Sequence, residues 1–295
     1  MKDRLVIPSN TKLAPWTERM LYTLVESEMF DVKMEEFPIP NLKPVVGKRH
    51  EFIGFFKFND VLMAVDVWDG NQPTSMIAEW INSHPFYSKT KIIFKTQYRT
   101  SVVTRELDKF TEATGIPVTN WSMFHSNTFP LEFFAWDKNK DYRYLTYISG
   151  KRRQSWLDYY KNSTEVATFD NAGLQKVPKN RPKLSSDAFL SIIQECKWGL
   201  SLKGKRISNL DCKNRREVEY SSARMPLALN YIPEYPFPFE KDIHYVYVDK
   251  PEDLLKLKDI DPVPYHEAAW ETYQKYFSVK GCSNVFLEIV NKVIK

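Results

Sequence analysis

The chain has 295 residues, of which 43% are hydrophobic and 27% charged, so we expect a soluble globular protein long enough for two domains. Its net charge of +5 favours an anionic ligand, but the basic residues are too scattered for a typical nucleic-acid-binding protein. Neither Gly-x-Gly-x-x-Gly nor the P-loop motif occurs, which argues against Rossmann-type dehydrogenases and P-loop enzymes.

The cysteine pattern indicates a reducing compartment. Cys196, Cys212 and Cys282 are odd in number, widely spaced and without a Cys-x-x-Cys pair, which argues against a disulfide framework or a zinc site. The first ten residues lack the apolar run of a signal peptide, and no stretch approaches the roughly 20 apolar residues of a membrane helix. We therefore expect a cytoplasmic location, in a cell or in an infected host.

The first half of the chain alternates strand and helix patterns. Strands are predicted over 5–8, 30–34, 61–67, 91–98 and 117–124, and helices over 13–29, 74–82 and 101–114. The run 61–67 is apolar and bounded by polar residues, as is typical of a buried parallel strand. Gly115 and Pro117 form the stop signal of the last of these helices.

A polar segment, 137–141, is the predicted linker, and the alternation restarts after it. Strands are predicted over 142–148, 166–169, 199–202, 226–231 and 243–248. Helices are predicted over 153–161, from a cap at 185–187 through Cys196, from Arg215 for a short distance, and over 251–257, 265–277 and 284–294.

This double alternation predicts the α/β class, with two doubly wound Rossmann-like domains facing across a cleft. The first domain is expected over 1–138 and the second over 139–275. A C-terminal helix, 276–295, is expected to pack back on the first domain. A cleft between two such domains is a common place for ligands.

The stretch 198–231 contains the strongest candidate site. Arg216 opens a short helix and Glu219 follows one turn later, at the carboxyl edge of the predicted sheet, where doubly wound folds bind ligands. A guanidinium pairs with diphosphate oxygens in a bidentate manner, and a carboxylate accepts hydrogen bonds from ribose hydroxyls. The alternative is an ordinary ion pair on a solvated helix face.

Two further basic segments follow predicted strands. Gly150 is followed by Lys151, Arg152 and Arg153 at a helix start, where cations oppose the helix dipole unless an anion compensates them. Lys203 follows the strand 199–202 and could also reach a diphosphate. A solvated loop is the alternative for both segments.

These residues resemble those of GT-B glycosyltransferases, particularly the exostosin-like and spore-protein-like branch. The resemblance rests on Gly199-Leu-Ser-Leu-Lys-Gly204, Arg216-x-x-Glu219, Pro226, and the strand 144–150 with its three following cations. It is recognisable over 142–255 and is closest to soluble enzymes of bacteria or of large DNA viruses of algae. It implies a nucleotide diphosphate-sugar donor, with a UDP-sugar as first choice, a glycan acceptor, no essential metal and no further cofactor. One residue departs from the pattern, because Arg224 stands where the family usually has Gly.

In GT-B proteins the N-terminal domain binds the acceptor. Here the strand 61–67 delivers Asp66 and Asp69 to its carboxyl end. An inverting transfer needs a base that takes the proton of the acceptor hydroxyl, and Asp69 is the first choice for it. Asp66 is a supporting carboxylate, and His125, after another predicted strand, is a second base candidate. The alternatives are an Asp-Gly turn for Asp69 and a structural hydrogen-bonded role for His125.

The sequence therefore predicts a metal-independent glycosyltransferase that acts by inversion. No His/Cys cluster suggests a metal site. A sugar-nucleotide epimerase or hydrolase on the same scaffold is one alternative, and a non-catalytic protein that binds glycans or nucleic acid is another.

Overall fold

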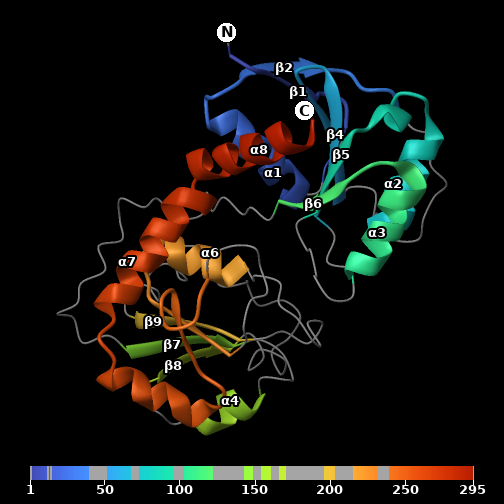
Figure 1. Cartoon of the computed structure of the whole chain (residues 1–295). Coiled ribbons are helices and arrows are strands. Elements are labelled where there is room, and N and C mark those ends of the chain that lie inside the picture. The colour runs from blue at the N-terminus through green and yellow to red at the C-terminus, as the bar shows by residue number, and fades with distance from the viewer. Residues whose placement is uncertain are drawn as a thin grey trace, which may run out of the picture. The chain divides into compact units, whose positions relative to one another are not determined.

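The structure, a computed structural model, forms a mixed α/β protein (Figure 1). It describes residues 2–11, 13, 15–39, 52–67, 73–95, 103–121, 143–148, 154–160, 166–170, 196–202, 215–230 and 239–294. The chain divides into two compact units, the first comprising Met1–His125 with Lys275–Lys295 and the second Ser126–Gln274. The linker predicted at 137–141 lies outside the described residues.

The first unit contains a six-stranded sheet with the order β2-β1-β3-β4-β5-β6. Its strands are β1 (Arg4–Pro8), β2 (Asp31–Glu35), β3 (Ile53–Phe58), β4 (Val61–Asp66), β5 (Ile92–Lys95) and β6 (Val118–Asn120). All except β3 run in the same direction, because β3 pairs in antiparallel fashion with both β1 and β4. The carboxyl ends of the other five strands therefore lie along one edge of the sheet.

Strand β3 is the element that the sequence analysis does not predict. It joins β4 through a two-residue turn, Asn59 and Asp60, whose φ angles are 46° and 65°. Two successive left-handed residues form a type I′ turn, which suits a β-hairpin. Asn59 is held in place by the main-chain N–H of Arg4, which donates to its Oδ1 at 2.8 Å. The hairpin makes the first sheet mixed, because β3 is antiparallel to both of its neighbours.

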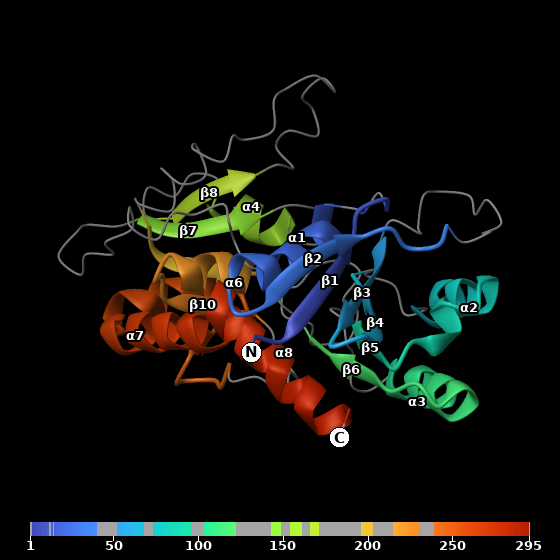
Figure 2. The same cartoon turned by 90° about the horizontal axis from the view of Figure 1, so that it is seen from above.

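Helices cover both faces of the first sheet (Figure 2). They are α1 (Pro15–Glu26), α2 (Pro73–Ser83), the short 3-10 helix η2 (Tyr87–Lys89), α3 (Val103–Thr114) and α8 (Val279–Val293). Residues of α2 and α3 pack on one face, around a core that includes Phe55, Trp80 and Ile93. Helix α8 packs beside α1 on the opposite face, where Phe286 contacts the rings of Phe30, Phe56, Phe58, Phe94 and Trp121.

The second unit contains a five-stranded sheet with the order β11-β10-β9-β7-β8, in which every pairing is parallel. Its strands are β7 (Arg143–Ile148), β8 (Val166–Asp170), β9 (Cys196–Ser201), β10 (Leu227–Leu229) and β11 (Tyr245–Tyr247). Numbered within the unit and starting from β8, the order is 2-1-3-4-5, which is that of flavodoxin-like doubly wound sheets. The order reverses between β7 and β9.

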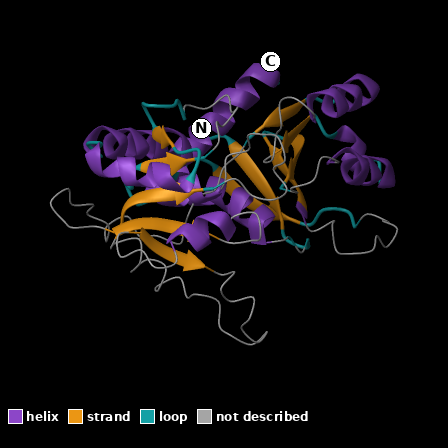
Figure 3. Cartoon of the chain, turned by 90° about the horizontal axis from the view of Figure 1, so that it is seen from below, coloured by secondary structure: helices purple, strands orange, loops and turns teal. Residues whose placement is uncertain are grey.

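The described helices of the second unit are α4 (Gln154–Tyr160), α6 (Arg215–Ser222), the 3-10 helix η6 (Pro251–Asp259) and α7 (Val263–Thr272), and η7 (Tyr273–Phe277) follows α7 across the boundary between the units. Figure 3 distinguishes the described helices and strands of the chain by colour. One face of the sheet packs Trp198 and Leu200 against Trp156 of α4 and Leu254 of η6. The other face carries Gly199. A Cβ atom at Gly199 would lie 2.6 Å from the Tyr220 ring of α6, so this helix can approach only a glycine.

Apart from the additional strand β3, the described elements follow the predicted alternation, and the start of β9 needs a correction. The helix predicted from 185–187 through Cys196 lies outside the described residues except for its last residue. Cys196 itself begins β9 and is buried, as the central position of this strand in a parallel sheet requires. The strand therefore starts three residues earlier than predicted.

Candidate functional site

The strand order of the second unit defines a candidate ligand site at its carboxyl edge. In doubly wound sheets, ligands bind at the edge where the strand order reverses, because the chain leaves the two central strands toward opposite faces. Here β7 and β9 are those strands, and Thr146 pairs with Leu200 near their ends. The predicted donor residues Gly150, Lys151, Arg152 and Arg153 follow β7 in the sequence, and Lys203 follows β9. All five lie outside the described residues.

Helix α6 carries the other two predicted donor residues. The backbones of Arg216 and Glu219 both lie in this helix, and their side chains are outside the described part of the structure. The carboxylate that the structure does describe there is Glu217, in the first turn and completely buried. A carboxylate in the first turn of a helix interacts favourably with the helix dipole. The sequence analysis missed Glu217, although its spacing from the buried Ser221 places both on one helix face.

The residue that departs from the family pattern, Arg224, closes α6. Its main-chain N–H donates to Ser221 O at 3.0 Å, and the N–H of Met225 donates to Tyr220 O at 2.9 Å. These two bonds form a Schellman motif, whose C′ residue is left-handed and usually glycine. Arg224 has φ 57° accordingly. The structure thus explains why glycine would be usual at this position.

The side chain of Arg224 is directed at α7. Its guanidinium carbon lies 4.0 Å from the centre of the Trp270 ring, a cation–π contact. Its carbonyl oxygen accepts a hydrogen bond from Nδ1 of His266. Burial holds the pKa of His266 below its ordinary value, and the neighbouring Arg224 charge acts in the same direction. Arg224 therefore links α6 to α7.

A second candidate site lies at the carboxyl edge of the first sheet. Asp66 ends β4 and Lys95 ends β5, and the two residues are paired in the parallel register. The Asp66 carboxylate and the Lys95 ammonium are 3.2 Å apart, and both side chains are 0% exposed. Ligands of α/β proteins bind at such edges. Asp66 was singled out from the sequence, whereas Lys95, which falls inside the predicted strand 91–98, was missed.

Two predicted acceptor-side residues cannot be compared with this geometry. Asp69 follows Asp66 by three residues and, like His125, lies outside the described residues. The structure therefore brings Asp66 together with Lys95 and leaves the two base candidates as predictions.

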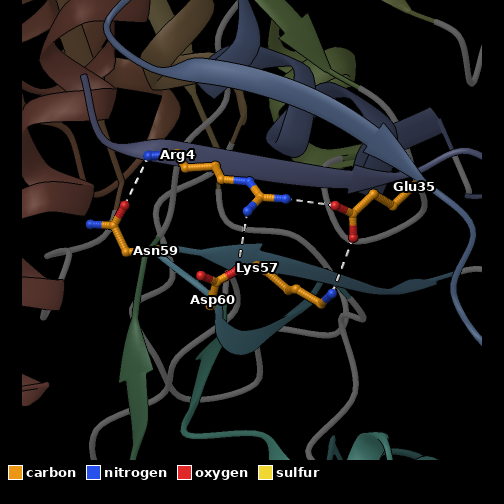
Figure 4. Close-up of polar contacts among 5 residues, drawn as sticks. All are labelled: Arg4, Glu35, Lys57, Asn59 and Asp60. Atoms are coloured by element: carbon orange, nitrogen blue, oxygen red, sulfur yellow. Dashed lines mark hydrogen bonds and ion pairs between the residues drawn. The ribbon is translucent and has the colours of Figure 1, made fainter. Parts of the chain in front are cut away.

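A separate charged cluster lies across β1, β2 and β3 (Figure 4). The Glu35 carboxylate is 2.7 Å from the Arg4 guanidinium and 3.2 Å from the Lys57 ammonium. The hydrogen bond from Lys57 holds the pKa of Glu35 below its ordinary value, and Arg4 adds to this effect. These side chains are 23–36% exposed, and their opposite charges lie close together. The cluster is a surface ion-pair network that ties β2 to the rest of the sheet.

Within the described part of the chain, no group of three or more His, Cys, Asp or Glu side chains could hold a metal ion. None of the described helices is both long and apolar enough to cross a membrane.

Comparison with known proteins finds matches among solved structures, and the one described here is weak. No model of a protein family matches the chain, and no curated protein matches it. Among solved structures, a glycosyltransferase from Rickettsia africae ESF-5 is similar over 98% of this chain and 97% of its own length, with 13% identity and a TM-score of 0.34. A likeness at this level does not assign a family.

Proposed function

We propose that this chain is a GT-B glycosyltransferase that moves a sugar from a nucleotide diphosphate-sugar to a hydroxyl of a glycan. The observation that carries the proposal is the strand order of the second unit, which reverses between β7 and β9. The sequence places basic residues after both of these strands. An anionic ligand at a reversal of strand order is the usual arrangement in doubly wound proteins.

The donor side of the proposed reaction uses the second unit. Lys151, Arg152 and Arg153, together with Lys203 and Arg216, neutralise the leaving diphosphate, which carries the electron pair of the broken bond to the sugar. Glu219 accepts hydrogen bonds from the ribose hydroxyls. Gly150 allows the backbone to approach the phosphates closely. A UDP-sugar is the first choice of donor.

The acceptor side uses the first unit. Asp69 takes the proton of the acceptor hydroxyl, whose oxygen forms the new bond to the anomeric carbon of the sugar as the diphosphate leaves. Attack from the face opposite the diphosphate inverts the anomeric configuration. His125 is the second candidate for this base, and Asp66 supports the site without contacting the sugar, because its carboxylate is buried.

The reaction requires no metal and no cofactor besides the donor, since the cations of the second unit supply the positive charge. The buried cysteines Cys196 and Cys282 are thiols, which suit the reducing cytoplasm of a cell or of an infected host. Addition of EDTA is therefore expected to leave the rate of transfer unchanged.

A product assay tests the proposal. The protein is incubated with radiolabelled nucleotide diphosphate-sugars and a panel of oligosaccharides, and the label is followed into glycan. Label in a longer glycan supports glycosyl transfer. Label that ends in an altered sugar nucleotide, or in free sugar with every acceptor, would instead indicate an epimerase or a hydrolase and contradict the proposal.

A further inference from the structure

The buried ion pair of the first sheet is not explained by stability alone. Asp66 and Lys95 lie 3.2 Å apart with no exposed side-chain surface. Their neighbours along the same face of the two strands, Ala64 and Ile93, belong to the apolar core under α2 and α3. Well-packed apolar residues of similar volume usually stabilise such a position at least as well as an ion pair, because both charges lose their hydration.

The backbone around the pair is firmly held. The N–H of Val67, which follows Asp66, donates to Phe52 O at 3.1 Å on the β3 side. On the β6 side, the N–H of Trp121 donates to Lys95 O at 3.2 Å. The ion pair thus joins two strand ends that are each bonded outward to the next strand of the sheet. Together these contacts fix four neighbouring segments at the carboxyl edge.

We propose that Asp66 and Lys95 form a positioning pair that sets the ends of β4 and β5 for catalysis on the acceptor side. This assignment rests on the proposed function. Asp69, the proposed base, follows Asp66 by only three residues in the sequence, so a shift of the end of β4 is expected to shift the base as well. A displacement of about 1 Å between a base and its substrate can lower a rate about 100-fold.

The test compares two double variants of the first unit. In Asp66→Asn/Lys95→Met both buried charges are removed while the side-chain volumes are nearly kept. The matched control, Glu35→Gln/Lys57→Met, removes an ion pair with the same 3.2 Å separation from the same sheet, away from the ends of β4 and β5. Melting temperature, donor dissociation constant, kcat and the KM for acceptor are measured for both variants and for the wild type.

The buried double variant is expected to melt close to the wild type and to bind the donor equally well. Its kcat is expected to fall about 100-fold, while the control keeps the wild-type kcat. If the pair had only a structural role, its removal would lower the melting temperature, and kcat and donor binding would change together. Lys95→Arg is a second probe if the double variant fails to fold, because it keeps the charge and moves its position. We expect it to lower kcat with unchanged donor binding.

Wild-type kcat in a folded Asp66→Asn/Lys95→Met variant would overturn the assignment and leave the proposed function intact, as would wild-type kcat in Lys95→Arg. If the wild-type protein itself binds no nucleotide diphosphate-sugar and forms no glycan, the proposed function fails and the assignment fails with it. The two failures are thus distinguished by the behaviour of the wild type.

Discussion

The guanidinium of Arg224 lies 4.0 Å from the ring centre of Trp270, so the side chain at the C′ position of α6 packs on α7. In the sequence, Arg224 stands where the resembled family usually has Gly. The structure favours a structural role, because the left-handed backbone and the ring contact together account for the residue. This relationship can be tested by substitution.

Arg224→Gly should be more stable than Arg224→Ala. Both substitutions lose the cation–π contact, which contributes about 0.5–1 kcal/mol at a partly exposed site. Only glycine relieves the left-handed conformation, which costs other residues about 1–2 kcal/mol. Urea unfolding should therefore show Arg224→Gly near the wild type and Arg224→Ala less stable than Arg224→Gly by about 1 kcal/mol. Equal stability of the two variants would contradict a left-handed C′ residue.

Gly199→Ala is expected to destabilise the protein by about 1–3 kcal/mol through overpacking. The added methyl group would lie 2.6 Å from the Tyr220 ring and 2.9 Å from Met225 Sδ. The measurement is a double-mutant cycle with Tyr220→Ala, which removes the ring. We expect Gly199→Ala to lower the free energy of unfolding by about 1 kcal/mol less in the Tyr220→Ala background than in the wild type. This difference is within the usual range for residues in contact. Additive effects would mean that the two residues do not touch.

Breaking the Asp66–Lys95 pair on one side should cost more than removing both charges. Lys95→Met leaves the buried Asp66 carboxylate without its ammonium partner, and such changes destabilise proteins by about 3–5 kcal/mol. Asp66→Asn/Lys95→Met should unfold at a urea concentration close to that of the wild type. A double variant less stable than Lys95→Met would show that the pair itself supplies the stability.

The free energy of unfolding should fall as the pH drops below about 6.5, because His244 and His266 have lowered pKa values in the folded protein. Burial lowers the pKa of His266 and of His244 from 6.5, although Glu240 and Glu271 oppose the shift at His244, and the hydrogen bond to the Arg224 carbonyl and Glu267 oppose it at His266. The unfolded chain then binds a proton more readily than the folded protein, so its population rises as the pH falls from 6.5 toward the folded-state pKa. Above pH 6.5 the two histidines have no such effect.

The variant His244→Gln/His266→Gln isolates this contribution. Its free energy of unfolding, measured at pH 7.5 and 5.5, should fall less over this interval than that of the wild type. Glu35 and Asp253 have lowered pKa values and titrate below about 4.5, outside the interval. The same pH dependence in both proteins would contradict the shift at the histidines.

The sequence predicts those elements whose pattern is local. Strand β4 is an uninterrupted apolar run, and α3 ends where Gly115 adopts φ 70°, so both can be located from neighbouring residues alone. Strand β3 was missed because its signal is the Asn59-Asp60 turn, which is informative only when the two flanking runs are considered as a hairpin.

The site residues also divide into those with a local sequence pattern and those whose burial depends on distant parts of the chain. Lys95 falls inside the predicted strand 91–98, and only the packing of β5 against β4 reveals that it is buried beside Asp66, 29 residues earlier in the chain. Glu217 was overlooked in favour of Glu219, because the sequence of a short, highly charged helix does not show which of its faces is buried. Burial in both cases depends on tertiary contacts, which periodicity over eight residues of α6 does not determine.

The melting temperature with nucleotide diphosphate-sugars tests the central claim most directly. The wild type is measured with UDP-, GDP-, CDP- and TDP-sugars, beside a variant in which Lys151, Arg152 and Arg153 are replaced by Ala. A control with Lys89, Lys91 and Lys109 replaced by Ala removes three cations from the first unit. At 100 times the dissociation constant a ligand stabilises by about 2.7 kcal/mol, or about 5–10 °C for a unit of this size. We predict such a shift for the wild type and the control with at least one donor, and its loss in the 151–153 variant. No shift of the wild type with any of the four donors would contradict the account.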